Sequence, residues 1–330
     1  MTGASATGRL VAALDGLFAF DAARDLPAIV DLLEMGFQEE LDAHDRRWLR
    51  ELANVAAAPG IGRWLLRLMA PTEGALAGFV WYEAGQLAGN VSLTRQPQGA
   101  WGIANVVTHP RFRRRGIARR LVVAAIDAAR RRGAPRVLLQ VRDDNAPARH
   151  LYESLGFHRR DALALWRMAE PRAVVRHRAS PLGWHVVAWH DRSDARVREC
   201  LARAGQPALA LGPLQRALSA GSWRRRLDDL VQGRTLIRRA ALVGRDFRAV
   251  AVAEGDGLGG PSRLELVVEP AWRGRFEALL VDALLDQLID GEPHELRCDV
   301  PAGDEALMAA LAAAGFRRAR TLDRYALEVG

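Results

Sequence analysis

The sequence predicts an α/β fold that occurs twice along the chain. Its length of 330 residues exceeds the ~100–200 residues of a typical single core, so two domains are expected. Between residues 103 and 157, strand-like and helix-like segments alternate around an arginine-rich turn. A weaker form of the same pattern returns 160 residues later, which indicates a duplicated domain rather than a solenoid.

The N-terminal part of the first repeat predicts one strand, two helices and a hairpin. Residues 18–20 read as a short strand, and Asp25-Leu26-Pro27 opens a helix with Asp25 as its N-cap and Pro27 in the first turn. A second helix is expected from Asp45 through Leu52, ending near Pro59-Gly60. Apolar runs at 79–83 and 87–93, separated by Ala84-Gly85, predict the hairpin.

The central part of the first repeat has the clearest periodicity. Residues 103–108 predict a strand that His109-Pro110 closes, and helical spacing of apolar residues predicts a helix over 117–132 that ends at Gly133. Residues 137–141 predict a further strand. Asn145 then caps a short helix that runs through Ser154 and ends at Gly156.

The domain boundary is expected where periodicity is lost, in a proline-containing stretch before Gly183. This places one domain over 1–170, a linker over 171–183 and a second domain over 184–330. The repeat aligns at shifts of 160 and 159 residues. The matched pairs are Pro110 and Pro270, Phe112 and Trp272, Arg113 and Arg273, Arg115 and Arg275, Ala118 and Ala278, Gly156-Phe157 and Gly315-Phe316, and Arg159 and Arg318.

Composition excludes several classes of protein. The chain is 49% hydrophobic and 26% charged, as in ordinary globular proteins. No apolar run approaches ~20 residues, and the first residues lack the features of a secretory signal, so neither a membrane span nor export is expected. The two cysteines, Cys200 and Cys298, fit buried thiols in a reducing cytosol. A cytoplasmic location is therefore expected.

The chain is basic, with a net charge of +8, and all 47 basic residues are arginine. This bias is typical of a GC-rich genome. A basic surface attracts nucleic acid, but neither zinc-ligand spacing nor an aromatic-interleaved basic strand accompanies the charge here. Nucleic-acid binding is therefore not favoured.

The arginine turn is suited to binding a phosphate. Residues 113–118 read Arg-Arg-Arg-Gly-Ile-Ala and lead from a strand into a helix. Unpaired N–H groups and about half a positive charge at a helix N-terminus bind anions. Gly116 and Ala118 are small where a diphosphate would approach the backbone. The alternative is a plain turn with a solvated arginine face, and a short glycine motif alone does not decide between them.

Asn145 and Tyr152 add a second candidate group. They lie seven residues apart on the same predicted helix, which is two turns and therefore nearly the same side. One helix and one strand separate this helix from the arginine turn, as expected if both segments flank one ligand. The alternative is that Tyr152 only packs its ring.

Residues 103–157 resemble the GNAT acyltransferase superfamily. The motifs that carry the resemblance are Asn-Val-Val-Thr-His-Pro, Arg-x-x-Gly-Ile-Ala and Asn-x-x-Ala-x-x-Leu-Tyr-Glu-Ser-Leu-Gly-Phe, in this order. The resemblance implies two domains, each a mixed twisted sheet flanked by helices. It also implies acetyl-coenzyme A as co-substrate and no metal ion.

The resemblance also assigns roles to residues. Backbone groups of residues 106–108 would meet the pantetheine arm and acetyl carbonyl, residues 114–119 would cradle the pyrophosphate, and Tyr152 would be the general acid. A phenol of pKa ~10 is protonated at neutral pH and can protonate a thiolate whose conjugate acid has pKa ~8.5. The implied cofactor-binding residues are Val106, Val107, Thr108, Arg113, Arg114, Arg115, Gly116, Ile117, Ala118, Arg119 and Asn145.

The general base is left open by the sequence. Family members that act on protein amines often carry a glutamate where this chain has Gln140, which cannot accept a proton. Four residues in the segment that usually builds the acceptor pocket are candidates for a water relay: Glu39, Glu40, Asp42 and His44. The alternative is that they form a solvated helix end.

The second repeat departs from the motif. Phe276 replaces the glycine of the turn, Glu277 brings a carboxylate to it, and Leu311 stands in the position of Tyr152. We therefore expect a degenerate GNAT-like domain that keeps the fold and completes the acceptor pocket or serves as a packing partner.

The expected activity is acetyl transfer from acetyl-coenzyme A to a primary amine. A small-molecule amine is favoured because two-domain members such as mycothiol synthase act on one. The alternatives are a protein N-terminal or lysine amine and, in another class, a non-catalytic acyl-coenzyme A sensor. The sequence does not predict the oligomeric state.

Overall fold

The computed structural model divides into two compact units. It describes residues 15–38, 41, 46–47, 49–51, 53–54, 77–171, 183–190, 194–205, 212–219, 234–255, 260–288 and 295–330. The first unit comprises 1–160 and 324–330, and the second comprises 161–323. The division at residue 160 differs from the expected domain limits because 163–168 pair with a strand of the second unit. The expected linker 171–183 lies, except for its ends, outside the described residues.

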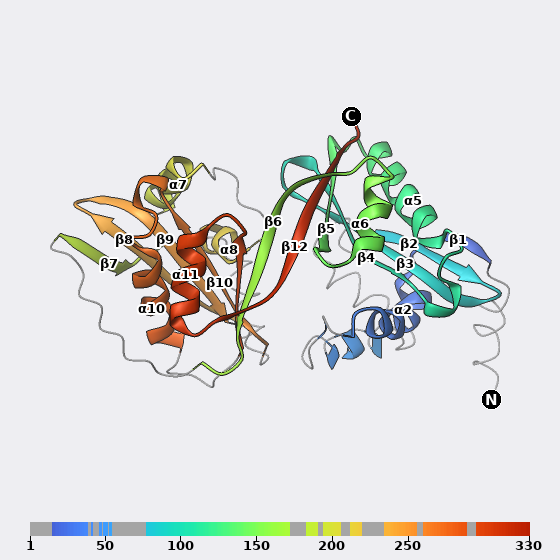
Figure 1. Ribbon diagram of the computed structural model, residues 1–330, viewed down its shortest axis with the longest axis horizontal. Coiled ribbons are helices and arrows are strands. Elements are labelled where there is room, and N and C mark those ends of the chain that lie inside the picture. Colours follow the sequence, from blue (N-terminus) through green and yellow to red (C-terminus); the bar gives the residue numbers. More distant parts are fainter. Residues whose placement is uncertain are drawn as a thin grey trace. The chain divides into compact units, whose positions relative to one another are not determined.

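The first unit is a sheet with helices on both faces (Figure 1). Its strands follow the order β1-β2-β3-β4-β5-β12. From β1 to β4, each strand is antiparallel to the next, whereas β4 and β5 are parallel. The elements are β1 Gly16–Ala19, α2 Ala22–Gly36, β2 Ala77–Glu83, β3 Gln86–Arg95, η1 Pro97–Gly99, β4 Trp101–Thr108, η2 Pro110–Phe112, α5 Ile117–Arg131, β5 Arg136–Arg142 and α6 Ala146–Glu153, with the start of β6 His158–Met168 and the end of β12 Arg317–Glu328.

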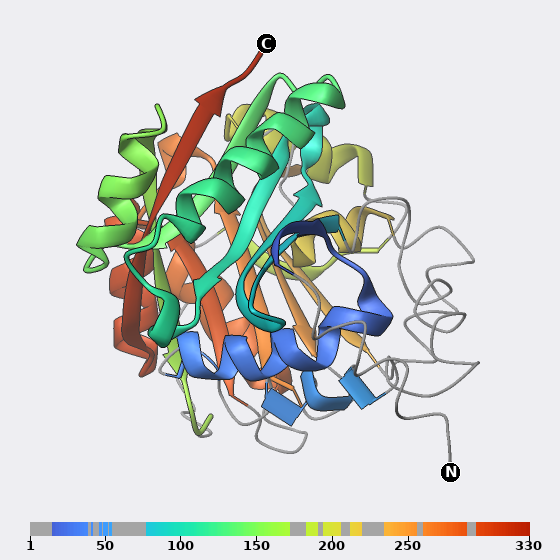
Figure 2. The same ribbon diagram turned by 90° about the vertical axis from the view of Figure 1, so that its right-hand side faces the viewer.

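Alternation along the strands separates two cores in the first unit. Val80 and Tyr82 of β2 pack with α2, whereas Phe79 and Trp81 pack with the core that contains α5 and α6. Successive strand residues point to opposite faces, so α2 covers one face and α5 and α6 cover the other. Figure 2 shows α2 and α5 on different sides of these strands.

Most predicted elements of the first repeat are confirmed. The strands at 103–108 and 137–141 and the helices at 117–132 and 145–154 occur within two residues of their expected bounds. The hairpin turns at Ala84 and Gly85, whose φ angles of 49° and 77° are those of a type I′ turn. Of the second helix expected over 45–52, the described residues are helical.

The predicted start of α2 is wrong by four residues. The helix begins at Ala22, and Asp21 rather than Asp25 accepts at its start, from the Arg24 N–H at 3.0 Å. Asp25 returns the bond by accepting from the Asp21 N–H at 2.7 Å, a reciprocal arrangement like a capping box. Both aspartates suit a helix start, and the chain uses them together.

The carboxylate of Asp25 is also the centre of a buried network. It is fully buried, accepts from the Tyr82 hydroxyl at 2.9 Å and pairs with the Arg24 guanidinium. Burial, followed by the bond to Asp25, raises the pKa of Tyr82 to about 12. A buried carboxylate needs such partners because its desolvation is costly, so this network joins α2 to β2.

The second unit repeats the architecture of the first. Its strands follow the order β6-β11-β10-β9-β8-β7, with β10 parallel to β11. The elements are β7 Trp184–Ala188, α7 Asp194–Arg203, α8 Pro213–Ser219, β8 Thr235–Val243, β9 Asp246–Gly255, β10 Ser262–Val268, η4 Pro270–Trp272, α10 Glu277–Leu288, β11 Leu296–Pro301 and α11 Glu305–Ala314. Ala249, Ala251 and Ala253 of β9 face α10 and α11, whereas Val250 and Val252 face α7 and α8.

The two repeats contribute strand ends to each other's unit. β6 leaves the first repeat and, from Asp161, belongs to the second unit, where it pairs with β11. β12 leaves the second repeat and, from Arg324, belongs to the first unit, where the Val329 N–H donates to the Pro135 carbonyl at 3.1 Å. The fold of each unit therefore needs residues from both repeats.

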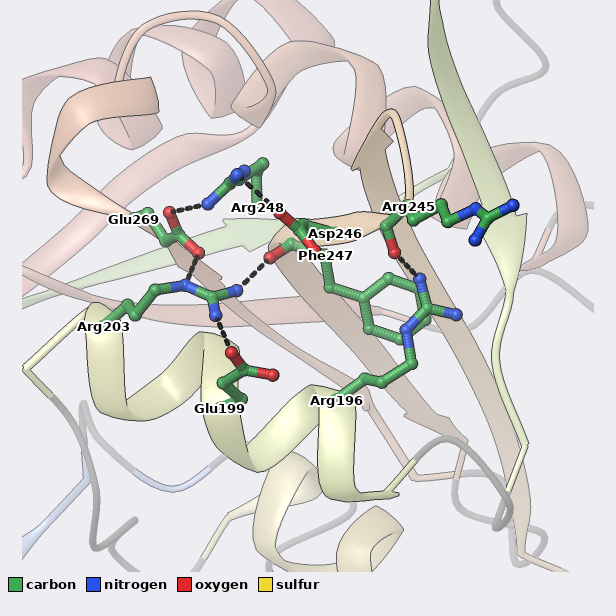
Figure 3. Close-up of polar contacts among 8 residues, drawn as sticks. All are labelled: Arg196, Glu199, Arg203, Arg245, Asp246, Phe247, Arg248 and Glu269. Atoms are coloured by element: carbon green, nitrogen blue, oxygen red, sulfur yellow. Dashed lines mark hydrogen bonds and ion pairs between the residues drawn. The ribbon is translucent and has the colours of Figure 1, made fainter.

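An arginine–carboxylate network fastens α7 to the sheet of the second unit (Figure 3). Glu269 is only 5% exposed and accepts from Arg203 at 2.6 Å and from Arg248 at 3.3 Å. Arg203 also donates to the Phe247 carbonyl at 2.8 Å. Because an unpaired buried carboxylate is costly, this network explains why Glu269 is kept inside the fold.

The cysteines are free and buried, as expected. Burial raises the pKa of the Cys200 thiol to about 12 and raises the pKa of Cys298 as well. Within the described ranges, no helix combines the length and apolar character that crossing a membrane requires, and no cluster of histidine, cysteine and acidic residues suits a metal ion.

Candidate functional site

The strands β4 and β5 diverge beside the arginine turn. They pair only at residues 101–103 of β4 and 137–139 of β5, although both continue for several residues. Val106, Val107 and Thr108 therefore lie on the part of β4 that β5 does not pair with. This end of β4 is therefore splayed from β5.

A β-bulge in β4 sets the direction of this free segment. Asn90 pairs with Val107 but Ser92 pairs with Ala104, so β4 has one extra residue there. Asn105 takes up the bulge with a φ of 53°, which asparagine tolerates better than most residues. The buried Asn90 amide donates to the Asn105 carbonyl at 3.0 Å, and the Asn105 amide donates to Ser92 Oγ at 3.2 Å.

The arginine turn has the conformation of an anion site. Arg114 and Gly116 have φ angles of 63° and 75°, and Gly116 caps α5 without a side chain. A Cβ placed on Gly116 would meet nothing within 4 Å. The space over the start of α5 is therefore open, and glycine is required there by its positive φ rather than by a close neighbour.

The backbone donors of this turn are available. The Arg113 N–H bonds to Pro110 and the Arg120 N–H bonds to Gly116. Between them, the N–H groups of 114–119 donate to no acceptor in the described part of the chain. Unpaired donors at a helix N-terminus attract an anion, so this row of six residues suits a pyrophosphate.

The arginine side chains of the turn are held by neighbouring groups. Arg113 Nε donates to the Thr108 carbonyl at 3.4 Å, and Arg119 Nη1 donates to Ser154 Oγ at 2.9 Å. Arg115 pairs with Glu83 at 3.0 Å and lies over the Phe112 ring. Arg119 thereby links the first turn of α5 to the end of α6.

Asn145 is an N-cap, as the sequence predicts. Its Oδ1 accepts from the Ala148 N–H at 3.2 Å, and its side chain is exposed. The capping bond uses the carbonyl oxygen of the amide, so the NH₂ group is left for an outside acceptor.

Tyr152 enters the core of the first unit from α6. It is 6% exposed, and its ring meets Phe157 edge to face, with centroids 6.0 Å apart. Within the described residues its hydroxyl makes no hydrogen bond. Burial raises the pKa of Tyr152 to about 12, so the phenol carries its proton throughout the neutral range.

The described structure does not test the candidates for the base. Gln140 lies on β5 and is exposed, and its amide has no basic group. Glu39, Glu40, Asp42 and His44 lie outside the described residues.

The second unit fills its own copy of the turn. Glu277, only 2% exposed, accepts from the Gly274 N–H at 3.0 Å and from the Phe276 N–H at 3.2 Å. Phe276 is buried and packs against Trp184 and Trp272. A carboxylate of the chain thus takes donors that remain open at 114–119.

The rest of the second copy follows the first closely. Asp304 caps α11 by accepting from the Leu307 N–H at 3.1 Å, as Asn145 caps α6. The Phe316 N–H bonds to the Leu311 carbonyl at 3.0 Å, as the Phe157 N–H bonds to Tyr152 at 3.1 Å. The predicted alignment of Leu311 with Tyr152 is therefore confirmed in the backbone.

Two features near the site were not predicted. The bulge at Asn105 has a signal in the sequence, an asparagine inside an apolar strand. Tyr325 of β12 has none in its local pattern: its hydroxyl donates to Glu153 at 2.8 Å, next to Tyr152 in α6.

The family model that matches is that of the Acetyltransferase (GNAT) family, over residues 33–157. The [Ribosomal protein bS18]-alanine N-acetyltransferase of Salmonella typhimurium strain LT2 is 46% identical over 54 residues, which are 16% of this chain and 36% of that protein. The enzyme of the same name from Escherichia coli K12 is 43% identical over 54 residues. The chain therefore aligns with about a third of the length of these relatives.

Two of the solved structures that match nearly the whole chain show its fold. A tandem GNAT protein from the clavulanic acid biosynthesis pathway, solved without AcCoA, has 21% identity and a TM-score of 0.63, over 95% of this chain and 98% of that one. A GCN5-related N-acetyltransferase from Sphaerobacter thermophilus has 16% identity and a TM-score of 0.68, over 95% and 96%. These likenesses concern the fold. Residues 33–157 match the GNAT family model, and the likeness over nearly the whole chain shows a tandem arrangement of two units with this fold.

Proposed function

We propose that the chain transfers an acetyl group from acetyl-coenzyme A to a primary amine at a single site in its first unit. The observation that carries the proposal is the row of unused N–H groups at 114–119, next to a strand that diverges from its neighbour. The second unit binds no acyl-coenzyme A in this proposal, because Glu277 already occupies donors of its turn.

The residues of the first unit have distinct parts in the proposed reaction. N–H groups of 114–119 hold the pyrophosphate, with the Asn145 amide on the pantetheine arm, and backbone groups of 106–108 orient the thioester. The neutral amine attacks the thioester carbon, so a C–N bond forms and the C–S bond breaks. Tyr152 donates a hydrogen bond to the developing thiolate and gives it a proton as the sulfur leaves. The nitrogen loses one proton to water or a base, and the phenol regains a proton from solvent before the next turnover.

The acceptor is proposed to be a small-molecule amine. Exposed Gln140 offers no carboxylate beside the reacting centre, which supports this class over protein amines. One observation favours the second candidate, a protein N-terminal amine: the relatives that match 54 residues are named for acting on a ribosomal protein alanine. A panel of polyamines, amino sugars, amino acids and peptides with free N-terminal alanine separates the two.

A Tyr152→Phe variant tests the proposed chemistry. Because the hydroxyl makes no bond within the described residues while the ring packs on Phe157, the change keeps the packing and removes only the proton donor. We expect turnover to fall about 10²–10⁴-fold, with acetyl-coenzyme A affinity nearly unchanged by calorimetry. Normal turnover would exclude Tyr152 as the acid. Binding of acetyl-coenzyme A without amine-dependent thiol release anywhere in the panel would favour a sensor.

A further inference from the structure

The chain holds three tyrosines, and one of them contacts the helix of Tyr152 from the far end of the sequence. Tyr325 belongs to the segment 324–330, which is part of the first unit. It is 1% exposed. Its hydroxyl donates to Glu153 Oε1 at 2.8 Å and accepts from Arg149 Nε at 3.4 Å.

These contacts hold α6 at a defined rotation. Arg149 and Glu153 are four residues apart and therefore lie on one face of the helix, and the Tyr325 hydroxyl bridges them. At the C-terminal end of the helix, Ser154 Oγ accepts from Arg119 at 2.9 Å. Tyr152 lies between these anchors in the sequence, so a rotation of α6 that broke the Tyr325 bonds would also move the Tyr152 hydroxyl.

Nonpolar contacts of the same segment support this placement. Leu327 packs on the core that contains Tyr152, and its Cδ1 lies 3.4 Å from the position of a Cβ on Gly156, the glycine that ends the α6 region. The Val329 N–H bonds to Pro135. The end of the chain is therefore fixed both beside α6 and before β5.

We propose that Tyr325 is a positioning residue for Tyr152: its hydrogen bonds to Arg149 and Glu153 hold α6 in the rotation that points the Tyr152 hydroxyl at the leaving sulfur. The inference rests on the proposed function of Tyr152. It makes the acid of the first repeat dependent on a residue encoded at the end of the second.

A set of tyrosine variants in the full chain tests the proposal. Tyr325→Phe keeps the buried ring and removes the bridge, so kcat for thiol release from acetyl-coenzyme A should fall about ten- to a hundredfold with the KM for acetyl-coenzyme A unchanged. Adding Tyr325→Phe to Tyr152→Phe should reduce kcat no further, because Tyr325 acts through Tyr152. Tyr82→Phe is the matched control: it also removes a buried tyrosine–carboxylate bond of the first unit, but away from α6.

Two further readouts distinguish positioning from stability. In chain labelled with 3-fluorotyrosine, Tyr325→Phe should shift the ¹⁹F resonance of residue 152, whereas Tyr82→Phe should not. Glu153→Gln keeps an oxygen that accepts from Tyr325 and should retain most of the activity, whereas Glu153→Ala should match Tyr325→Phe.

The outcomes separate this inference from the proposed function. If Tyr152→Phe turns over normally, the acid assignment fails and the inference fails with it. If Tyr152→Phe is impaired while Tyr325→Phe has wild-type kcat and an unshifted resonance, only the positioning role is overturned. The positioning role is also overturned if Tyr325→Phe lowers kcat by the same factor in the Tyr152→Phe background as in the wild type. Any effect of the control Tyr82→Phe should be independent of Tyr152 in this way.

Discussion

Replacing Glu277 by alanine should destabilise the second unit far more than is usual for a glutamate at a helix start. The carboxylate is buried and accepts from the N–H groups of Gly274 and Phe276. Hydrogen bonds to a charged group contribute about 1.5–3 kcal/mol each, and a carboxylate at a helix N-terminus adds about 0.3–1 kcal/mol. Water can replace the bond at Gly274, where the turn has open space, so the net loss should be about 2–4 kcal/mol.

Urea unfolding followed by tryptophan fluorescence measures this loss, because Trp184 and Trp272 pack on Phe276. With an m-value of about 2 kcal/mol/M, the midpoint of the transition of this unit should fall by about 1–2 M. Glu277→Gln keeps one acceptor oxygen, so its unfolding midpoint should lie between those of the wild type and Glu277→Ala. Glu305 is the matched control, since it is also the first residue of a helix in this unit but is exposed. Equal effects of Glu277→Ala and Glu305→Ala would refute the reasoning.

Three further predictions concern the site and the buried groups. Gly116→Glu should abolish acetyl-coenzyme A binding in calorimetry. The control Gly133→Ala imposes a similar strain, at a φ of 69° with no neighbour within 4 Å, and should leave the affinity unchanged. Retained binding in Gly116→Glu would contradict the proposed pyrophosphate site at 114–119. The pKa values of Tyr82 and Tyr152 are raised to about 12, above the ordinary value of ~10. Between pH 10 and 12 the folded chain therefore binds more protons than the unfolded chain. Its stability should fall as the pH rises through this range. Thermal melts should show this fall, and Tyr152→Phe should make it shallower; an equally steep fall in the variant would count against the shifted pKa. Cys200 and Cys298, buried and with raised pKa values, should react with an aromatic disulfide reagent only as the chain unfolds, and rapid reaction of the native chain would show that they are exposed.

Local features of the fold could be predicted from the sequence, but the exchange of strand ends between the two repeats could not. The limits of α5 and α6 follow from periodicity and from Gly133, Asn145 and Gly156, all of which act within a few residues. The start of α2 was placed wrongly because Asp21 and Asp25 both suit a helix start. Each repeat ends in a strand, over residues 158–168 and 317–328. No local pattern in either strand predicts which unit its last residues join. Tyr325 therefore reaches α6 through a strand assignment that only the three-dimensional structure reveals.

The candidate site likewise has a part that could be predicted from local sequence and a part that depends on pairing across the sheet. The arginine turn is a short segment whose glycine and helix start can be read directly, and the structure shows its open donors at 114–119. The bulge at Asn105 depends on pairing with Asn90 and Ser92 across the sheet, so an asparagine in the strand is only a hint. The candidate base residues at 39–44 lie outside the described residues and stay predictions.

The two arginine turns satisfy their helix starts in different ways within the same local fold. Both turns lead into a helix whose first N–H groups need acceptors. In the first copy Ile117 points into the core and leaves the donors to an outside anion. In the second copy the aligned residue is Glu277, whose carboxylate supplies that anion from within the chain. The helix start of the second copy is thus satisfied from within the chain. Phe276 and Leu311, which stand at the positions of Gly116 and Tyr152, pack in the core of the second unit.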